Sequence, residues 1–316
     1  TFSFPVGSYW RLVKGVSKTL TVKANLNGIL TGDEAGGATT GDAPIITVDT
    51  IDPKGVSSGN DSIAVNSGAA GDTTVVDLVG NVQYLRQSKP TLASASLLST
   101  NYGTGEKALY RWTVTADSKG AIGWMKVVFD MSGSVTFNSA LNTVGCNTVC
   151  TGSNDGGVGS WFSDGVYMST STDAPTQLIA TSSMKLYNRT TGVQLTGTTT
   201  ATAWTVTSTT GISKISFVPD AEQIVAAGET VTYELLGNIL KAGATGDILQ
   251  TKIADRGVTA TSSVGYATVA NVDSPLYTFV WTDRSGSGAT HSSDSGDWAH
   301  DYKVLGIATA TLSLSR

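Results

Sequence analysis

Few side chains in this sequence of 316 residues have both the type and the spacing that catalysis requires. A hydrolytic triad needs a nucleophile, a histidine base and an acid that orients the histidine. The only histidines, His291 and His300, both fall in one loop-like stretch near the C-terminal end. The acidic residues are scattered through turns, where aspartate mostly accepts hydrogen bonds from the local backbone instead of forming a glycosidase pair. The sequence therefore predicts neither catalytic residues nor an enzyme.

Calcium is the ion that the acidic loops suit best, because it binds carboxylate and carbonyl oxygens in flexible loops. The candidate ligands are Asp155 and Asp164 in one glycine-rich stretch, and Asp294 and Asp297 in another. No EF-hand spacing and no G-G-x-G-x-D repeat defines a coordination shell around them. Bound calcium and solvated turn aspartates are the two interpretations, and no other cofactor is predicted.

The only two cysteines, Cys146 and Cys150, lie close together in the stretch VGCNTVCTG. A turn there closes a small disulfide ring if it brings the two Cβ atoms to about 3.8 Å. Two reduced thiols, or redox and metal use, are the alternatives, although a zinc site lacks nearby histidines. We predict the disulfide, which indicates an oxidising, extracellular setting.

Surface chemistry has two further candidates. Asn188 opens an N-R-T motif and Asn60 an N-D-S motif, both in predicted turns that suit a sugar acceptor. Aromatic residues in or beside loops suit ordinary packing, a subunit interface or contact with a glycan. These residues are Tyr9, Trp10, Trp161, Phe162 and Trp298.

Composition argues against two classes of partner. Charged residues make up 14% of the chain, the formal net charge is −5, and the 20 Lys and Arg residues are scattered singly. No basic patch is available to neutralise phosphates, so nucleic acid is not a predicted partner. No apolar run of about 18 residues occurs, so no membrane span is predicted. The sequence shows no signal peptide either, so we interpret a secreted form as a processed or trimmed product.

The elements that carry these residues are predicted to be β-strands. Residues 109–116 alternate, with one face made of Tyr110, Trp112, Val114 and Ala116. Residues 122–131 are more continuously apolar, as in a central strand, and residues 117–120 between them are typical of a hairpin turn. Further strands are predicted at 18–26, 45–51, 73–79, 201–207, 212–218, 222–226 and 229–239, with a hairpin at 184–197. This pattern predicts an all-β fold of tandem immunoglobulin-like β-sandwich domains.

An internal repeat organises the chain, and repeats of this kind dictate architecture. The stretch 211–265 has a second copy at the N-terminus, in which Gly15 corresponds to Gly228 and Gly41 to Gly246. Residues 51–56 (IDPKGV) align with 253–258 (IADRGV) without a gap. Only the second half of the repeat is present in the N-terminal copy. The first domain is therefore predicted to be incomplete, with an unpaired edge that something must cover.

The chain accordingly divides into four parts. These are 1–81, the C-terminal half of a sandwich repeat; 82–90, a connector; 91–269, a complete sandwich with a loop insertion at 138–165; and 270–316, a C-terminal strand module. Two terminal strands cannot form a stable core alone, so the module must pack on the preceding domain or on a neighbour. Its last strand is the candidate for donation to another subunit. The apolar face of that strand is Ala308, Ala310, Leu312 and Leu314.

Two stretches carry a resemblance to a known family. The ending FVWTDRS, DWAHDYKV and LSLS resembles the C-terminus of repeat-bearing secreted cell-surface proteins, of surface-layer type, from ultrasmall bacteria of the candidate phyla. ALYRWTVTADSKGAIGWMKVVFDM is similar to the core repeat of the same proteins. The resemblance covers about 90–316 and implies a surface or surface-layer role, with no catalytic motif. It also implies longer relatives with a signal peptide and earlier repeats.

These observations favour a structural extracellular protein that assembles with copies of itself into a filament or surface layer. An incomplete domain needs strands from elsewhere, and head-to-tail strand addition generates a fibre. The alternatives are a surface adhesin or carbohydrate-binding module that uses the 138–165 loop on a cell-surface glycan, and the non-catalytic part of a larger secreted enzyme.

Overall fold

The computed structural model describes thirteen parts of the chain: 11–19, 21–25, 28–29, 37–48, 78–134, 179, 183–203, 213–239, 245–246, 248–255, 277–286, 291–301 and 304–316. These residues form β-strands and no α-helix. The strands are β1 (Thr47–Val48), β2 (Leu78–Val79), β3 (Pro90–Ser94), β4 (Gly105–Ala116), β5 (Ile122–Ser134), β6 (Lys185–Asn188), β7 (Val193–Leu195), β8 (Gly197–Ala203), β9 (Ser213–Pro219), β10 (Gln223–Val225), β11 (Thr230–Ile239), β12 (Ile248–Lys252), β13 (Phe279–Thr282), β14 (Trp298–Ala299) and β15 (Leu312–Ser315).

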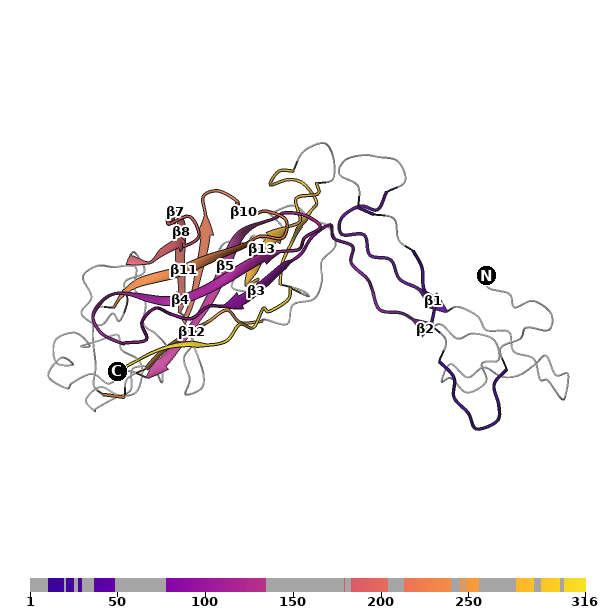
Figure 1. Ribbon diagram of the computed structural model, residues 1–316, viewed down its shortest axis with the longest axis horizontal. Coiled ribbons are helices and arrows are strands. Elements are labelled where there is room, and N and C mark those ends of the chain that lie inside the picture. The colour runs from indigo at the N-terminus through magenta and orange to yellow at the C-terminus, as the bar shows by residue number, and fades with distance from the viewer. Residues whose placement is uncertain are drawn as a thin grey trace.

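Two antiparallel sheets pack into a sandwich (Figure 1). The five-stranded sheet has the order β3-β4-β11-β6-β7. In the eight-stranded sheet β5 is the centre: β9 and β10 pair with it, as do β12 and β13. Strands β8, β14 and β15 then pair with β9, β13 and β12. The predicted all-β architecture of packed antiparallel sheets is confirmed.

Strand β4 is an interior strand of the five-stranded sheet and β5 is the centre of the eight-stranded sheet, as their apolar patterns indicate. The predicted inward face of β4 is buried, with Trp112 and Val114 fully inaccessible. Residues 117–120 do turn, and Lys119 N–H donates to Asp117 Oδ1 at 2.9 Å. The two strands nevertheless belong to different sheets, so the predicted hairpin is wrong. Both strands bury aromatic side chains in one core, and the chain therefore folds over that core instead of pairing β4 with β5.

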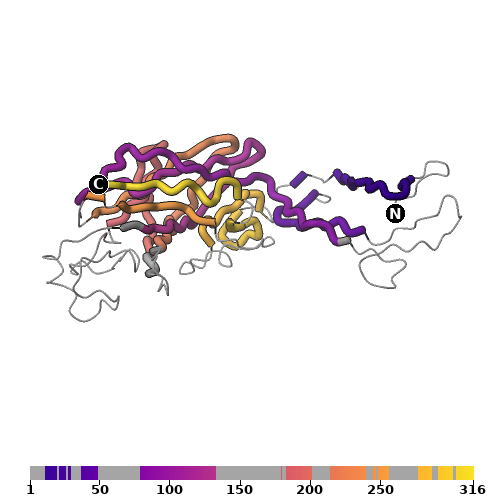
Figure 2. The backbone as a smooth tube through the Cα atoms, turned by 90° about the horizontal axis from the view of Figure 1, so that it is seen from below, coloured from indigo at the N-terminus to yellow at the C-terminus, as the bar shows by residue number. Residues whose placement is uncertain are grey.

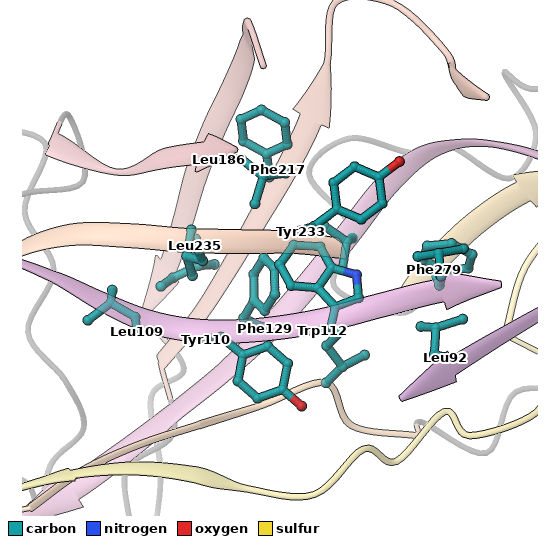
Figure 3. Close-up of a cluster of buried hydrophobic side chains, with 14 of the residues drawn as sticks. Leu92, Leu109, Tyr110, Trp112, Phe129, Leu186, Phe217, Tyr233, Leu235 and Phe279 are labelled. Carbon is teal, nitrogen blue, oxygen red and sulfur yellow. The ribbon is translucent and has the colours of Figure 1, made fainter. Parts of the chain in front are cut away.

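An aromatic cluster joins the two sheets (Figure 3). The ring of Trp112 on β4 lies 5.1 Å from Phe129 on β5 and 5.5 Å from Tyr233 on β11, measured between centroids. Trp124 on β5 meets Tyr233 edge-on at 5.1 Å. Each such pair adds about 0.5–1.5 kcal/mol beyond the burial of its area. This cluster sets the distance between the two sheets. The loops at the ends of the sandwich are then available to form functional sites.

The C-terminal residues complete this sandwich. Strand β13 pairs with β5, and β15 pairs with β12 in the register Leu314 to Leu249. The described residues of the predicted C-terminal module therefore supply strands to the main sheet. They pack on the preceding domain, which was one of the two predicted possibilities.

The predicted alternation of the last strand is only partly right. Leu314 is buried, but Ala308 and Ala310 are exposed, and the strand itself begins at Leu312. Thr309 points inward instead, where its hydroxyl bonds to the hydroxyl of Tyr110. Ala308 has a φ of 63°, a left-handed conformation that does not belong to a regular strand, so the period of two does not extend through this stretch.

The described residues of 11–48 and 78–85, here called the open repeat, lie beyond one end of the sandwich, with the C-terminus at the other end (Figures 1 and 2). Strand β1 pairs with β2, and Leu85 N–H extends this ribbon by donating to Asp42 O at 2.9 Å. The strand predicted at 18–26 does not form among its described residues. Residues 18–19 and 21–25 are exposed and carry no strand pairing there.

Two turns of the open repeat match turns of the sandwich, as the sequence repeat predicts. Gly15 and Gly228 have φ of 77° and 74°, and each occupies the third position of a turn. Val16 N–H donates to Val13 O at 3.0 Å, and the second turn has the corresponding bond at 2.9 Å. Gly41 and Gly246, with φ of 83° and 98°, are the second matched pair. The two copies of the repeat thus share their geometry at the glycines that need it.

Replacing Gly228 with alanine is expected to lower the free energy of unfolding by about 1 kcal/mol. A left-handed φ is strained for alanine, while no clash adds to the cost, because the atom nearest to the added methyl group would be Ser118 Cα at 3.8 Å. Urea denaturation followed by tryptophan fluorescence measures the change. Gly103→Ala is the control, since Gly103 has an ordinary φ and only the Lys107 side chain near it, at 3.9 Å. Equal effects of the two substitutions would contradict the prediction.

Candidate functional site

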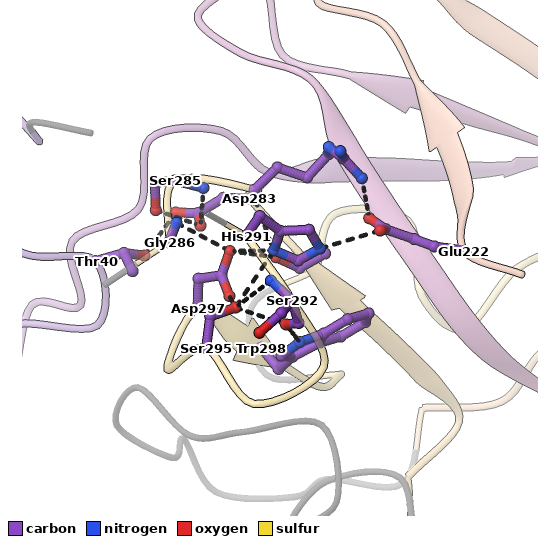
Figure 4. A network of polar contacts seen from close by, with 12 residues as sticks. Thr40, Glu222, Asp283, Ser285, Gly286, His291, Ser292, Ser295, Asp297 and Trp298 are labelled. Carbon is purple, nitrogen blue, oxygen red and sulfur yellow. Dashed lines mark hydrogen bonds and ion pairs between the residues drawn. The ribbon is translucent and has the colours of Figure 1, made fainter. Parts of the chain in front are cut away.

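Most of the chemically capable side chains gather in the segment between β13 and β14 (Figure 4). Strand β13 ends at Thr282, and the chain returns at Trp298 to start β14. The described residues of this segment place three groups of interest, Asp283, His291 and Asp297, at the end of the sandwich that faces the open repeat.

Asp297 is the centre of the network. Its carboxylate accepts hydrogen bonds from Thr282 Oγ1 at 2.8 Å, from Gly286 N–H at 3.0 Å and from Ser295 Oγ. His291 Nδ1 lies 2.8 Å from Asp297 Oδ2. Burial alone would raise the pKa of Asp297, but the hydrogen bonds from these four residues outweigh it and hold the pKa below its ordinary value.

His291 connects the segment between β13 and β14 to Glu222, just before the start of β10. Its Nε2 lies 3.0 Å from Glu222 Oε2, and Arg284 Nη1 lies 2.6 Å from Glu222 Oε1. Glu222 immediately precedes β10, and it packs against Gly123 so closely that any Cβ there would meet its carboxylate. The imidazole therefore bridges two carboxylates, with an arginine balancing the outer one.

Asp283 joins the open repeat to the sandwich. Its Oδ2 accepts from Thr40 Oγ1 at 2.6 Å and from Gln87 N–H at 2.9 Å, while Oδ1 accepts from Ser285 Oγ at 2.7 Å. Arg86 Nη1 donates to the carbonyl of Asp297 at 3.0 Å. We call this set of contacts the polar joint. It holds residues from three distant stretches of the sequence in one buried cluster.

In this geometry the hydrogen bonds and ion pairs hold the carboxylates in place and neutralise their charge. A hydrolytic triad would place a serine hydroxyl on the imidazole nitrogen that faces away from the acid. Here that nitrogen, Nε2, faces Glu222, and Ser295 Oγ donates to Asp297 Oδ1. Among the residues that the structure describes, no group of three or more His, Cys, Asp or Glu side chains is arranged to hold a metal ion.

The predicted calcium ligands have different fates. Asp297 is buried and its carboxylate is engaged by hydrogen-bond donors, whereas Asp294 is exposed on the same loop. Asp155 and Asp164 lie outside the described residues. The structure therefore does not bring the predicted ligands together in the part that it describes.

Several other predicted site residues also lie outside the described parts of the chain. They are Cys146, Cys150, Asn60, Tyr9, Trp10, Trp161, Phe162 and the rest of the 138–165 loop. The disulfide and the glycan-contact interpretation of that loop stay predictions.

Asn188 and Trp298 are described, and both have structural partners. Asn188 Oδ1 accepts from the backbone N–H of Thr190 at 3.0 Å and of Thr191 at 3.1 Å, which closes the predicted turn between β6 and β7. Trp298 is buried, with Nε1 donating to Ser292 O at 3.0 Å. Of the three interpretations of Trp298, ordinary packing is the one that this position fits.

Sequence reasoning missed the polar joint. The candidate acids were recognised singly, but Thr40, Arg86 and Glu222 carried no pattern that would relate them to the β13–β14 segment. The one usable signal was the local density of Asp, Ser and His between 282 and 301.

A second candidate surface is the open repeat itself. Among the described residues, twelve large hydrophobic side chains are exposed, and eight of them belong to the open repeat. These eight are Leu12, Val13, Val16, Val22, Ile45, Ile46, Val79 and Val82. Scattered apolar residues are normal on a surface, so it is the concentration of these eight in one part of the described chain that makes the open repeat a candidate interaction site.

Comparison with known proteins adds no family. No protein-family model matches the chain, and no curated protein matches it. In the described part of the chain, no helix is long and apolar enough to cross a membrane.

Proposed function

We propose that the protein is a structural extracellular component built of two immunoglobulin-like repeats in tandem. It joins neighbouring subunits into a filament or surface layer by β-strand pairing at the open repeat. The observation that carries this proposal is that, among the described residues, eight of the twelve exposed large hydrophobic side chains lie in the open repeat. A strand edge that exposes apolar side chains gains both ladder hydrogen bonds and burial when another polypeptide adds a strand to it.

Two features support an assembly role. The polar joint fixes the open repeat to the sandwich through buried hydrogen bonds, so a subunit bound at the open repeat would be held in a defined position. The open repeat and the C-terminus lie at opposite ends of the described chain (Figure 2). That placement suits a head-to-tail contact, which does not close and extends into a fibre. The extracellular location rests on the predicted Cys146–Cys150 disulfide.

The test is the association of the full chain and of two matched double variants. We expect the unchanged chain to form larger species with rising concentration, seen by light scattering after size-exclusion chromatography and by negative-stain microscopy. Ile46→Lys with Val79→Lys places charge on the open repeat and should return the chain to monomers. The control, Leu98→Lys with Ile224→Lys, changes side chains of the sandwich that are 84% and 55% exposed, and should leave association intact.

Two results would contradict the proposal. One is an unchanged chain that stays monomeric at every concentration. The other is an equal loss of association in the sandwich control, which would mean that general surface hydrophobicity drives the effect. Circular dichroism of each variant establishes that the sandwich itself is still folded.

A further inference from the structure

The outer face of the five-stranded sheet carries a row of four polar side chains. On β4 the side chain of Trp112 is buried in the core, so its neighbour Arg111 points to the opposite face. Arg111 is paired in register with Glu234 on β11. Glu234 is paired in turn with Tyr187 on β6, and Tyr187 with Gln194 on β7. Directly opposed residues share a face of the sheet, so these four side chains form one row across it, here called the outer row.

Glu234 is buried although it belongs to an outer face. The residue is 2% exposed, whereas Arg111 and Tyr187 on either side are half-buried and Gln194 is exposed. A glutamate on the outer face of a sheet ordinarily extends into water, because a carboxylate is costly to bury unless its oxygens accept hydrogen bonds. The hydrogen-bond partners of Glu234 therefore decide what this position can do.

Arg189 satisfies only one of the two carboxylate oxygens of Glu234. Its Nε and Nη2 both contact Oε2, at 2.6 Å and 2.5 Å. An arginine fork frequently makes two parallel bonds, one to each oxygen of a carboxylate. Here Oε1 is buried and has no hydrogen-bond partner among the described residues. A charged acceptor thus remains open in the middle of the outer row.

Arg111 places an open donor next to this open acceptor. Its Nε is also buried, and the described part of the chain offers it no acceptor. Arg111 and Glu234 are directly opposed in the β4–β11 ladder, which puts their Cβ atoms about 5 Å apart. The two atoms are therefore neighbours, but neither satisfies the other.

The chemistry of the two atoms selects the group that fits between them. The carboxylate of Glu234 would repel an anion there, and the guanidinium of Arg111 would repel a cation. A hydroxyl is neutral, accepts a hydrogen bond from Arg111 Nε–H and donates its own to Glu234 Oε1. Both bonds are charge-assisted, and such bonds are roughly twice as strong as neutral ones. A water molecule satisfies the same pair, and a ligand that reproduces these bonds with its own hydroxyl can displace it.

We propose that the outer row is a binding site for a neutral glycan. One sugar hydroxyl bridges Arg111 Nε and Glu234 Oε1. Tyr187 adds an aromatic surface with a polar end, and the exposed amide of Gln194 adds donors and an acceptor for further hydroxyls. Arg111 is only half-buried, so a rotation of its long side chain is enough to admit the hydroxyl.

Arg189 holds the rest of the outer row in position before any ligand binds. Its guanidinium carbon lies 4.5 Å from the centroid of the Tyr187 ring, while its Nε donates to Glu234. The backbone of Arg189 is fixed as well, because its N–H donates to Thr232 O at 2.7 Å. A site that is already ordered loses less conformational freedom on binding. Tyr187 and Glu234 are therefore placed for recognition in advance.

The test is affinity electrophoresis of the full chain in native gels, each containing one soluble polysaccharide. The neutral polymers are dextran, mannan, galactan, arabinoxylan and laminarin, and the acidic polymers are alginate and polygalacturonate. We expect at least one neutral polymer to retard the chain, and the acidic polymers to leave its mobility unchanged. The dependence of mobility on polymer concentration gives the dissociation constant.

Two variants and a control locate the binding. Arg111→Met keeps the length of the side chain but removes the donor, and should raise the dissociation constant about 10-fold or more. Glu234→Gln removes the charge of the acceptor and should raise it similarly. The control is Lys185→Met, which removes a cation from a side chain of β6 that is 39% exposed, and should leave the dissociation constant unchanged.

Three results would overturn the inference: no retardation by any neutral polymer, retardation by the acidic polymers alone, or equal weakening by Lys185→Met and Arg111→Met. If circular dichroism shows that Glu234→Gln does not fold, Arg111→Met decides alone. The inference goes beyond the proposed function and does not rest on it. The Ile46→Lys, Val79→Lys variant should bind the polymer as the unchanged chain does, so failure of glycan binding and failure of self-association are separate results.

Discussion

Replacing Asp297 with alanine is expected to lower the free energy of unfolding by about 4 kcal/mol. The carboxylate is fully buried and accepts hydrogen bonds from Thr282, Ser295 and the Gly286 N–H, while it also pairs with His291. Alanine would leave the Thr282 hydroxyl and the Gly286 N–H without their acceptor in a buried site, whereas Ser295 Oγ keeps the carbonyl of Ser292. An unsatisfied buried polar group costs about 1–3 kcal/mol, so two of them exceed the effect of an ordinary surface change. Guanidinium denaturation followed by tryptophan fluorescence measures the difference.

Asp294→Ala is the matched control, because it removes the same side chain from an exposed position three residues earlier in the same loop. Its expected effect is within about 0.5 kcal/mol. Asp297→Asn should fall between the two, since an amide keeps the shape but has one acceptor oxygen in place of two. If Asp297→Ala were as mild as Asp294→Ala, the carboxylate would not be the centre of the network. Faster amide hydrogen exchange in residues 40–48 of the Asp297→Ala variant would further show that the polar joint holds the open repeat.

The sandwich was predictable because its signals are local. Alternation in β4 places every second side chain on one face, and burial then selects the face that carries Tyr110 and Trp112. The turn at Asn188 was also local, because its side chain bonds to the backbone two and three residues further on. Both predictions needed only neighbouring residues.

The errors arose where partners far apart in sequence decide the structure. Sheet membership of β4 and β5 depends on which core each strand faces, and a short turn between them fits either arrangement. Thr309 is buried because the hydroxyl of Tyr110 offers it a partner, which an alternating pattern does not show. The same position makes Tyr110 a weaker acid, since burial raises the pKa of its hydroxyl to about 12.

The candidate site was the least predictable part for the same reason. Thr40, Glu222 and Asp283 come from three stretches of the chain, and only the folded arrangement brings them to one loop. Residues 18–26 show the converse case. Their alternation is that of a strand, but a strand is half-buried only when neighbours pair with it, and the described residues contain none.

Between pH 6.5 and pH 4 the free energy of unfolding of the unchanged chain is expected to fall by about 3 kcal/mol. Replacing His300 with phenylalanine should abolish this fall. His300 is 2% exposed, and neither ring nitrogen has a hydrogen-bond partner in the described structure. Burial, with a smaller contribution from the charge of Arg86, lowers the pKa of His300 to about 4. The unfolded chain binds a proton below about pH 6.5, whereas the folded chain does not until about pH 4. Acid therefore favours unfolding across this window.

The His300→Phe substitution separates the effect of protonation on stability from the effect of ring packing. The imidazole stacks on Tyr277 with the ring centroids 4.3 Å apart, and a phenyl ring can take the same place without a nitrogen to protonate. Stability at pH 7.5 should then be nearly unchanged, while its slope between pH 6.5 and pH 4 flattens. Asp297 does not confuse the result: its lowered pKa means that its contribution is present above about 3.9 and is lost only as the pH falls below that value. An unaltered slope in the variant would show that other groups carry the acid sensitivity and that His300 is accessible to protons in the folded state.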